Sequence, residues 1–248
     1  MNTNHHCRSA IPVPAVLAVL AGALVGACAT ESSGSADSAD PAEMVSQSSG
    51  SISAETVYKP APWKKTYSEG RRVIRREARQ VGDSPNKWII DEFDSPDGTL
   101  RGGLVRQTTL ERGADGSVFL VELGLVLENR SLAFDPPLVL MPATLTGEKA
   151  CISTSDVTMK DGDSAAATKT RGTATQTTKL VRQSGDSTVI RSQMEAKFDF
   201  STVDRTAVLT VVPGRGIVRE VQDRSVRFGL FNLSRTTSTV TLVEQVDQ

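Results

Sequence analysis

Alternation of apolar and polar residues with a period of two constrains the fold of this chain more than any other feature. The alternation is clearest in residues 189–200, where Ile190, Met194 and Phe200 share one face and Arg191 lies on the other. Successive side chains of a β-strand point to opposite sides of the sheet, so this pattern is typical of a half-buried antiparallel strand. The segment therefore predicts a strand with one face in a core.

Similar runs recur along the chain and are separated by turn sequences. Pro-Asp-Gly at 96–98 and Pro-Gly-Arg-Gly at 213–216 favour turns, because Pro presets φ and Asp-Gly or Gly tolerates positive φ. Residues 128–137, which end in two prolines, are expected to form a loop. We expect nine or ten strands, and no segment shows the periodicity of a helix. The expected strands are residues 72–80, 87–93, 99–112, 117–127, 138–141, 150–160, 189–200, 202–212, 217–228 and 236–246, with Thr-rich 165–183 showing no helical period.

These runs together predict a mainly β domain over residues 70–248. The domain is expected to be an antiparallel meander that forms a strongly curved sheet, a half-barrel or a barrel. One face of the sheet should be apolar, and the other charged and rich in Thr. Stability should come from this apolar core, since about 180 residues suffice to build one.

Residues 1–27 have the layout of a secretory signal. A polar start containing Arg8 precedes the apolar run 11–26, which is shorter than the roughly 20 residues of a spanning helix. Val-Gly-Ala at 25–27 then leads into Cys28. This four-residue segment resembles the lipobox of bacterial lipoproteins, in which an aliphatic residue and two small residues precede a cysteine.

The resemblance implies that Cys28 becomes the amino terminus and carries acyl chains, such as palmitate, that anchor the protein to a membrane. Each buried CH₂ contributes about 0.8 kcal/mol, so two or three chains hold a domain stably. Ala29 follows the cysteine where an Asp would favour the inner membrane, which implies the outer membrane, facing the periplasm or the surface, in an organism that has one. The alternative is an ordinary signal cut near Ala27 or Ala29.

Residues 28–69 are expected to be a disordered tether between the anchor and the domain. The stretch from Ala29 to about Glu55 is rich in Ser, Gly, Ala and Asp and has too few bulky apolar residues to offset chain entropy. Trp63 and Tyr67 either pack against the edge of the domain or lie loose.

The residues that remain after removal of the leader exclude several kinds of site. His5, His6 and Cys7 lie in the leader, so Ser-His-Asp, Cys-His and His-based metal sites cannot form in the mature chain. Cys151 has no partner for a disulfide and is expected to be buried as a small apolar side chain. Loss of Arg8 leaves 27 basic against 29 acidic residues, with no basic stripe for nucleic acid.

Several motifs are interpreted as structural rather than functional. Gly214 and Gly216 lack the third glycine and the helix of a nucleotide-binding loop. Glu195 alternates with Arg191 on an outward face, whereas a glycosidase needs two carboxylates that face each other across a sugar cleft. Two acidic groups are interpreted as solvated turns, because they lack the spacing of a calcium loop: these are Asp91, Glu92, Asp94 and Asp97, and Asp161 with Asp163.

Two further stretches carry a resemblance. Phe-Asp-Pro-Pro-Leu-Val-Leu-Met-Pro at 134–142 with Gly-Glu at 147–148, and Pro-Gly-Arg-Gly-Ile-Val-Arg-Glu at 213–220, resemble uncharacterised bacterial envelope domains. Those domains are similar to the curved half-barrels of the lipoprotein carriers LolA and LolB. The resemblance implies a curved sheet able to shelter an apolar ligand, and it supplies no catalytic residue.

The sequence thus favours a non-enzymatic envelope lipoprotein: a β-rich binding or scaffold domain on an acylated tether. Its expected partners are the membrane, through the acyl chains on Cys28, and a lipid or protein of the envelope, but no nucleic acid. No catalytic residue, cofactor or metal ligand is assigned. The alternative is an envelope hydrolase that uses carboxylates or a Ser-Lys pair.

Overall fold

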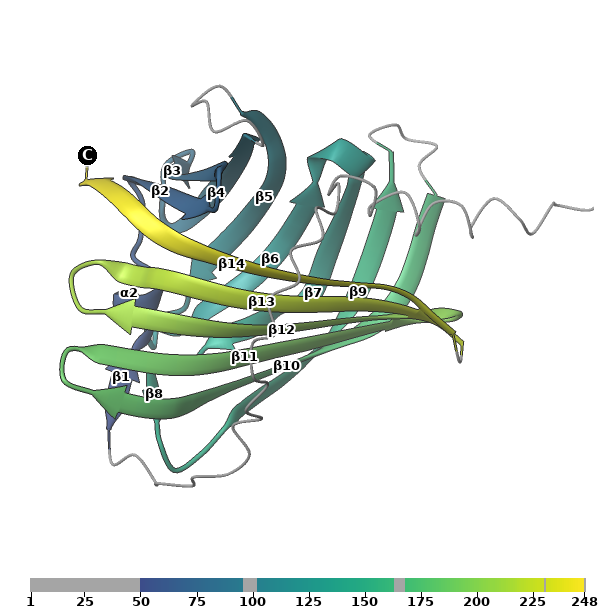
Figure 1. The fold of residues 1–248 in the computed structure, drawn as a ribbon. Helices are drawn as coiled ribbons and strands as arrows, with labels where there is room; N and C mark the ends of the chain where they lie inside the picture. Colours follow the sequence, from purple (N-terminus) through teal and green to yellow (C-terminus); the bar gives the residue numbers. More distant parts are fainter. Residues whose placement is uncertain (1–49, 96–101, 163–167, 230, 248) are drawn as a thin grey trace, which may run out of the picture. The chain divides into compact units, whose positions relative to one another are not determined.

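A computed structural model describes residues 50–95, 102–162, 168–229 and 231–247. In this part of the chain twelve antiparallel strands form a closed barrel (Figure 1). The strands follow one another around the barrel in chain order, and pairing of β14 with β2 closes the ring. They are β2 (Trp63–Glu69), β3 (Arg72–Val81), β4 (Ser84–Ser95), β5 (Gly103–Arg112), β6 (Val118–Leu125), β7 (Arg130–Met141), β9 (Cys151–Asp161), β10 (Thr168–Ser184), β11 (Ser187–Phe198), β12 (Ser201–Val212), β13 (Gly216–Phe228) and β14 (Phe231–Asp247).

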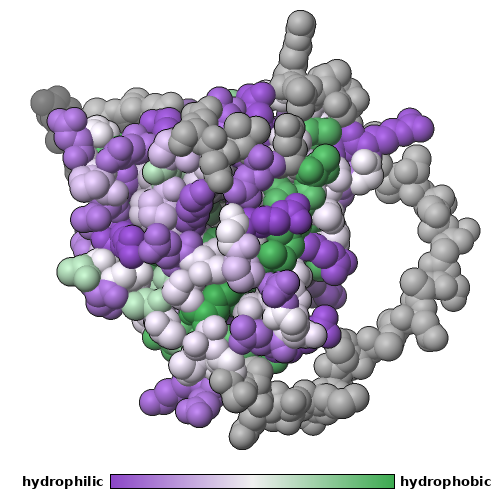
Figure 2. Space-filling view, turned by 90° about the vertical axis from the view of Figure 1, so that its left-hand side faces the viewer, coloured by the Kyte–Doolittle hydropathy of each residue, from purple (hydrophilic) through white to green (hydrophobic). Residues whose placement is uncertain are grey.

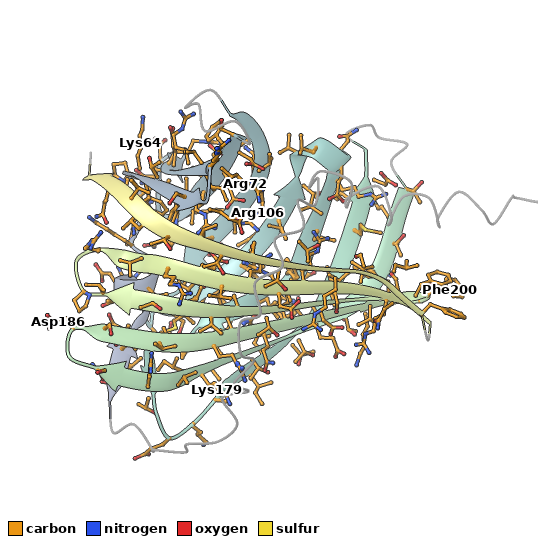
Figure 3. All side chains as sticks on the ribbon, viewed as in Figure 1. Lys64, Arg72, Arg106, Lys179, Asp186 and Phe200 are labelled. Atoms are coloured by element: carbon orange, nitrogen blue, oxygen red, sulfur yellow. The ribbon has the colours of Figure 1, made fainter. Side chains whose placement is uncertain are left out.

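This architecture confirms the expected mainly β, antiparallel meander, in its closed form. Because the strands run up and down in turn, alternate turns gather at alternate ends of the barrel. The β3–β4, β5–β6, β10–β11 and β12–β13 turns lie at what we name the capped end, and the β2–β3, β6–β7, β11–β12 and β13–β14 turns lie at the far end. In Figure 3, Asp186 marks the capped end and Phe200 the far end.

The capped end is closed by the segment that precedes the barrel. There β1 (Ser51–Ser53) pairs with β8 (Thr144–Thr146), and the single-turn helix α2 (Ala54–Val57) follows. Ser53 caps this turn by accepting a hydrogen bond from the N–H of Thr56 at 3.3 Å. The apolar side chains of the segment point into the barrel, where Ile52, Ala54, Val57 and Leu145 are all buried.

Figure 2 shows the face of the molecule at the capped end. Hydrophilic residues cover most of this face, and hydrophobic residues gather in one band between them. Apolar contacts of the cap with the barrel are accompanied by polar ones, including the ion pair of Glu55 with Arg112 at 3.0 Å. No helix among the described residues is long and apolar enough to cross a membrane.

The prediction of a loop at 128–137 is wrong, because residues 130–137 belong to β7. Leu120 of β6 pairs with Leu138, and Glu122 pairs next with Ala133. Residues 134–137 of β7 therefore bulge away from β6, so Pro136 and Pro137 occupy positions where a missing N–H breaks no ladder bond with β6. A short 3₁₀ turn, η2 (Val126–Glu128), is all that separates β6 from Asn129 and β7.

The barrel also includes residues that precede the expected boundary at Gly70. Strand β2 pairs with β3 on one side and with β14 on the other. Trp63 and Tyr67 of β2 are buried, at 6% and 2% exposure, so they belong to the interior rather than to an edge. The leader, Cys28, and the tether up to residue 49 lie outside the described residues.

The outer and inner faces of the barrel wall differ in polarity. Outward positions carry ion pairs such as Lys64–Glu77 and Glu195–Lys197, whereas most inward positions near the capped end are apolar. Burial of these inward side chains drives folding at about 25 cal/mol per Å² of apolar surface. The largest buried side chains of this core include Trp88, Leu110, Val118, Leu138, Met141, Leu145, Val157, Ile190 and Val211.

Candidate functional site

Five charged side chains point into the barrel and form what we name the arginine–glutamate layer: Arg76, Glu92, Arg106, Arg205 and Glu220. They come from five different strands, β3, β4, β5, β12 and β13. The register explains the grouping on one side, since Arg76 pairs across the ladder with Glu92, and Glu92 pairs with Arg106. Residues paired directly across a ladder lie on the same face of the sheet, so all three side chains point inward together.

The layer is one continuous chain of charge-assisted hydrogen bonds. Glu92 Oε2 accepts from Arg76 Nε at 2.7 Å and from Arg106 Nη2 at 2.6 Å. Glu220 accepts from Arg76 Nη1 at 2.9 Å and from Arg205 Nη2 at 3.0 Å. Arg205 Nε donates to Gln222 Oε1 at 2.9 Å. Each glutamate therefore bridges two arginines, and such bonds are about twice as strong as neutral ones.

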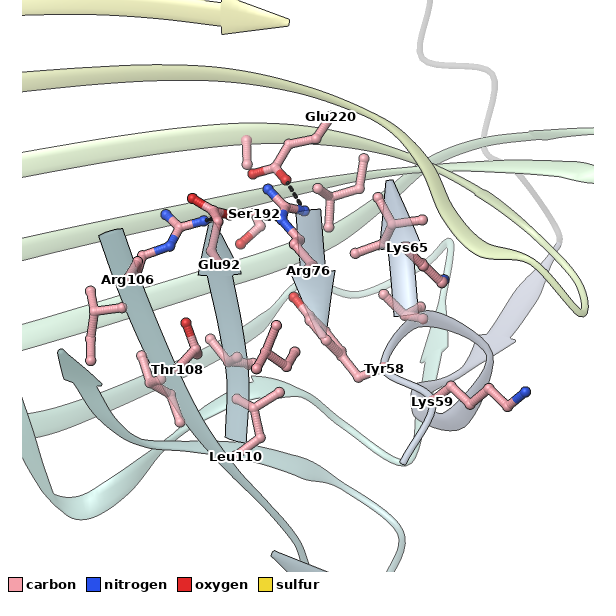
Figure 4. A pocket seen from close by; sticks show the side chains of 18 of the residues that line it. Tyr58, Lys59, Lys65, Arg76, Glu92, Arg106, Thr108, Leu110, Ser192 and Glu220 are labelled. Carbon is pink, nitrogen blue, oxygen red and sulfur yellow. Dashed lines mark hydrogen bonds and ion pairs between the residues drawn. The ribbon is translucent and has the colours of Figure 1, made fainter. Parts of the chain in front are cut away.

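The bond between Arg76 and Glu220 crosses the interior of the barrel, because two strands, β14 and β2, separate β13 from β3. The Arg76 guanidinium also lies 4.7 Å from the ring centroid of Tyr67, a favourable cation–π contact. Tyr67 in turn donates its hydroxyl to the carbonyl oxygen of Ile217 at 3.2 Å. These contacts fix the guanidinium of Arg76 at the centre of the layer (Figure 4).

Burial and the neighbouring charges shift the pKa values of the layer in opposite directions. Burial opposes ionisation of Glu92, but Arg106 and Arg76 outweigh it and lower the pKa of Glu92 to about 2. Glu220 is likewise buried, and Arg76, Arg205 and Arg106 lower its pKa to about 2. Burial, followed by the other two arginines, lowers the pKa of Arg205 despite Glu220. Both carboxylates are therefore ionised at neutral pH.

A cavity of about 120 Å³ adjoins the layer. The polar part of its lining includes the layer itself, Thr108, Gln176 and Ser192, and Gln176 Nε2 donates to Ser192 Oγ at 2.8 Å. Figure 4 shows Arg106, Glu92, Arg76 and Glu220 along one side of this cavity, above Leu110 and Thr108. Its apolar lining includes Ile90, Leu110, Leu120, Leu140, Met194 and Leu209.

The polar and apolar linings are separated along the barrel axis. From the far end toward the capped end, the inward side chains of β5 are Arg106, Thr108 and Leu110, and those of β12 are Arg205, Ala207 and Leu209. Strand β4 follows the same order, with Ile90 and Trp88 nearer the capped end than Glu92. The cavity is therefore amphipathic: its arginine–glutamate wall lies toward the far end, and its lining toward the cap is mostly apolar, with Lys59 and Lys65 as the charged exceptions.

The segment after α2 completes the lining of the cavity. Val57, Tyr58 and Lys59 line it together with Trp63 and Lys65 of β2. Trp63 holds this segment in place by donating its indole N–H to the carbonyl oxygen of Lys59 at 2.8 Å. Burial raises the pKa of Tyr58 to about 12, so its hydroxyl stays protonated, and Lys65 Nζ donates to the carbonyl oxygen of Arg215.

The acidic group expected at a solvated turn is instead part of strand β4, and its members face in different directions. Asp91 faces outward, where it accepts from Arg79 Nε at 2.7 Å and from Gln107 Nε2 at 2.8 Å. Glu92 faces inward and belongs to the arginine–glutamate layer. Asp94 accepts two bonds from Arg72, at 2.8 and 2.6 Å. The prediction of a solvated turn is wrong for these three; Asp97 lies outside the described residues.

Other sequence candidates lie apart from the cavity. Asp161 ends β9 and lies 3.4 Å from Arg130, while Asp163 lies outside the described residues. Glu195 faces outward and pairs with Lys197 at 2.8 Å. Cys151 is a free thiol that packs against the core while remaining half-buried, and this partial burial raises its pKa.

Gly214 lies in the β12–β13 turn and Gly216 is the first residue of β13, and both have positive φ, 76° and 67°. The expected turn is therefore confirmed, and these glycines serve its backbone conformation.

Among the residues that the structure describes, no group of three or more His, Cys, Asp and Glu side chains is placed to hold a metal ion. Cys28, the expected lipid acceptor, lies outside those residues. Comparisons of the chain with protein-family models, with curated proteins and with solved structures find no match.

Proposed function

We propose that this chain is a lipid-anchored binding protein of the cell envelope whose barrel shelters a small, largely apolar molecule without transforming it. The observation that carries this proposal is the interior cavity of about 120 Å³ next to the arginine–glutamate layer. Ligand sites are mostly apolar clefts with a few well-placed polar groups. The lining of this cavity has that composition, and the cap supports retention of a bound molecule.

The anchor rests on the sequence. Cys28 follows Val-Gly-Ala at the end of a short apolar run, and acylation there would hold the barrel near a bilayer surface. The polarity of the barrel fits this arrangement, because its outward strand positions carry ion pairs such as Lys64–Glu77 and Asp204–Arg227. A barrel wall that faces lipid carries an apolar outer band instead, so attachment through acyl chains suits this wall better than insertion.

The alternative of a carboxylate hydrolase has less support from the geometry. A general acid needs a pKa near the working pH, whereas the neighbouring arginines lower the pKa values of Glu92 and Glu220 to about 2. Within the cavity lining, Ser192 accepts from Gln176, and Lys65 donates to a backbone carbonyl oxygen. The polar groups therefore resemble a fixed binding wall more than a set of proton-transfer groups.

Filling the cavity tests the binding function. Ala207 is 3% exposed and lines the cavity, so Ala207→Leu should reduce its volume. We expect a six-carbon probe, hexanoate or 1-hexanol, to raise the midpoint of thermal unfolding of the purified full chain, and Ala207→Leu to abolish this increase. Ala114→Leu, at an exposed turn position, is the matched control and should keep it. Failure of both probes to bind the unaltered chain would overturn the proposed function.

The anchor is tested separately. Cells that express the full chain are grown with an alkyne fatty acid, and the protein should become labelled. Cys28→Ala should abolish the label, because it removes the acceptor sulfur. Labelling that survives this substitution would contradict the anchor and leave the binding function standing.

A further inference from the structure

We propose that the ligand is a small amphiphilic acid, whose anionic head binds Arg106 and whose apolar body lies against the wall toward the cap. This inference rests on the proposed function and specifies its ligand class. It comes from three features of the cavity: its balance of charge, the hydrogen-bonding capacity of Arg106, and the separation of its linings.

The charge of the layer is unbalanced. Three arginines share two glutamates, and side-chain exposures within the layer run from 5% for Glu220 to 32% for Arg205. A buried charge is costly unless an opposite charge and hydrogen bonds compensate it. A bound anion would balance the excess.

Arg106 is the arginine with the most remaining capacity to bind that anion. A guanidinium has five N–H donors. Contacts among the described residues use two groups of Arg76 and two of Arg205, but only Nη2 of Arg106. The Arg106 side chain is 22% exposed and lines the cavity. Its planar fork suits two parallel bonds to a carboxylate or a phosphate-type head.

The volume and polarity of the cavity limit the rest of the ligand. An apolar cavity of about 150 Å³ accommodates the six heavy atoms of a benzene molecule, so about 120 Å³ corresponds to an apolar body of about five heavy atoms, the length of the hexanoate chain beyond its carboxylate. Leu110 lies four residues beyond Arg106 on β5, toward the cap. A head on Arg106 therefore directs a short chain or ring toward the apolar wall formed by Leu110, Leu120 and Leu209.

Three probes of matched length test the head group: hexanoate, 1-hexanol and hexylamine, titrated into the purified full chain by calorimetry. We expect hexanoate to bind at least tenfold more tightly than 1-hexanol, and hexylamine to bind more weakly than either. Equal affinity for hexanoate and 1-hexanol, or preference for hexylamine, would overturn the anionic head while leaving the binding function intact. If none of the probes binds, the proposed function fails and this inference fails with it.

Substitution of Arg106 tests the residue. Arg106→Gln should weaken hexanoate binding at least tenfold and change 1-hexanol binding by less than twofold, whereas Arg106→Lys should keep part of the preference for the acid. Arg219→Gln removes an exposed, outward arginine from β13 and should change neither. An unchanged preference in a folded Arg106→Gln variant would overturn the assignment; if that variant does not fold, the head-group comparison on the unaltered chain decides.

Discussion

Asp204 and Arg205 are neighbours on β12, yet their ion pairs lie on opposite sides of the barrel wall. Asp204 faces outward and accepts from Arg227 Nη2 at 2.7 Å, with side chains 34% and 45% exposed. Arg205 faces inward and donates to Glu220 at 3.0 Å, and the Glu220 side chain is only 5% exposed. The outer bond, between Arg227 and Asp204, is the shorter of the two, so bond length does not show which ion pair contributes more to stability.

The surroundings of the two pairs do distinguish them. Water and salt screen charges at the outer wall, where ion pairs contribute about 0–1 kcal/mol. In the interior the carboxylates of Glu220 and Glu92 are largely shielded from water, at 5% and 13% exposure. They therefore depend on their arginine partners, and removal of one partner leaves the other uncompensated. The comparison shows that similar geometry on the two faces of one strand has different consequences for stability.

The largest expected effect follows from removing an inner carboxylate. Glu220→Gln keeps the shape of the side chain but leaves Arg76 and Arg205 with one anionic partner fewer. We expect the free energy of unfolding to fall by about 3–5 kcal/mol, measured by urea denaturation at pH 7. Glu195→Gln makes the same chemical change at the outer wall, and an equal loss in both variants would contradict the comparison.

A further large effect is expected from acid, which should reduce the contribution of the arginine–glutamate layer to the free energy of unfolding. The pKa values of Glu92 and Glu220 are about 2 in the folded protein, below the ordinary value of about 4.3. Because folding lowers them, their contribution is complete above about pH 5 and is lost as the pH falls from about 5 to about 2, at about 3 kcal/mol for each carboxylate. Urea denaturation at a series of pH values should show this decline. Glu220→Gln should have a shallower decline, and an identical one would contradict the assignment.

The smallest effect is expected at the outer wall. Asp204→Asn should change the free energy of unfolding by less than about 1 kcal/mol. A double-mutant cycle with Arg227→Gln should give a small coupling that disappears in 1 M NaCl, where the Debye length is about 3 Å. A coupling as large as that of the inner layer, or one insensitive to salt, would show that burial is not the deciding factor.

The sequence was most informative where one face of a strand is apolar. Ile190 and Met194 are buried on the inner side of β11, as their alternation with Arg191 predicts. Phe200 was expected on the same face, yet it lies beyond the end of β11 and is 70% exposed. Alternation identifies a face only within the strand, and it cannot show where the turn begins.

The arginine–glutamate layer was missed because charges occupy both faces of the strands that form most of it. Asp91 and Glu92 are adjacent acids, and Arg75 and Arg76 are adjacent bases, so neither pair shows which residue is inward. The sequence did contain a signal in β5 and β12. Arg106 and Arg205 each lie an even number of residues from a buried leucine, Leu110 and Leu209, so each must share the inward face of its strand. The contact between β3 and β13 depends on closure of the barrel, which local patterns do not contain.

Closure of the ring by β14 has a consequence for the order of assembly. Residues 241–247 must pair with residues 63–68, which lie about 175 positions earlier in the sequence. Pairings between such distant parts of a chain form slowly. Until they form, β2 and β14 each present an unpaired edge that another chain can extend. A protein shortened before Phe231 would have permanently unpaired edges at β2 and β13, and its characteristic failure would be edge-to-edge aggregation rather than simple loss of stability.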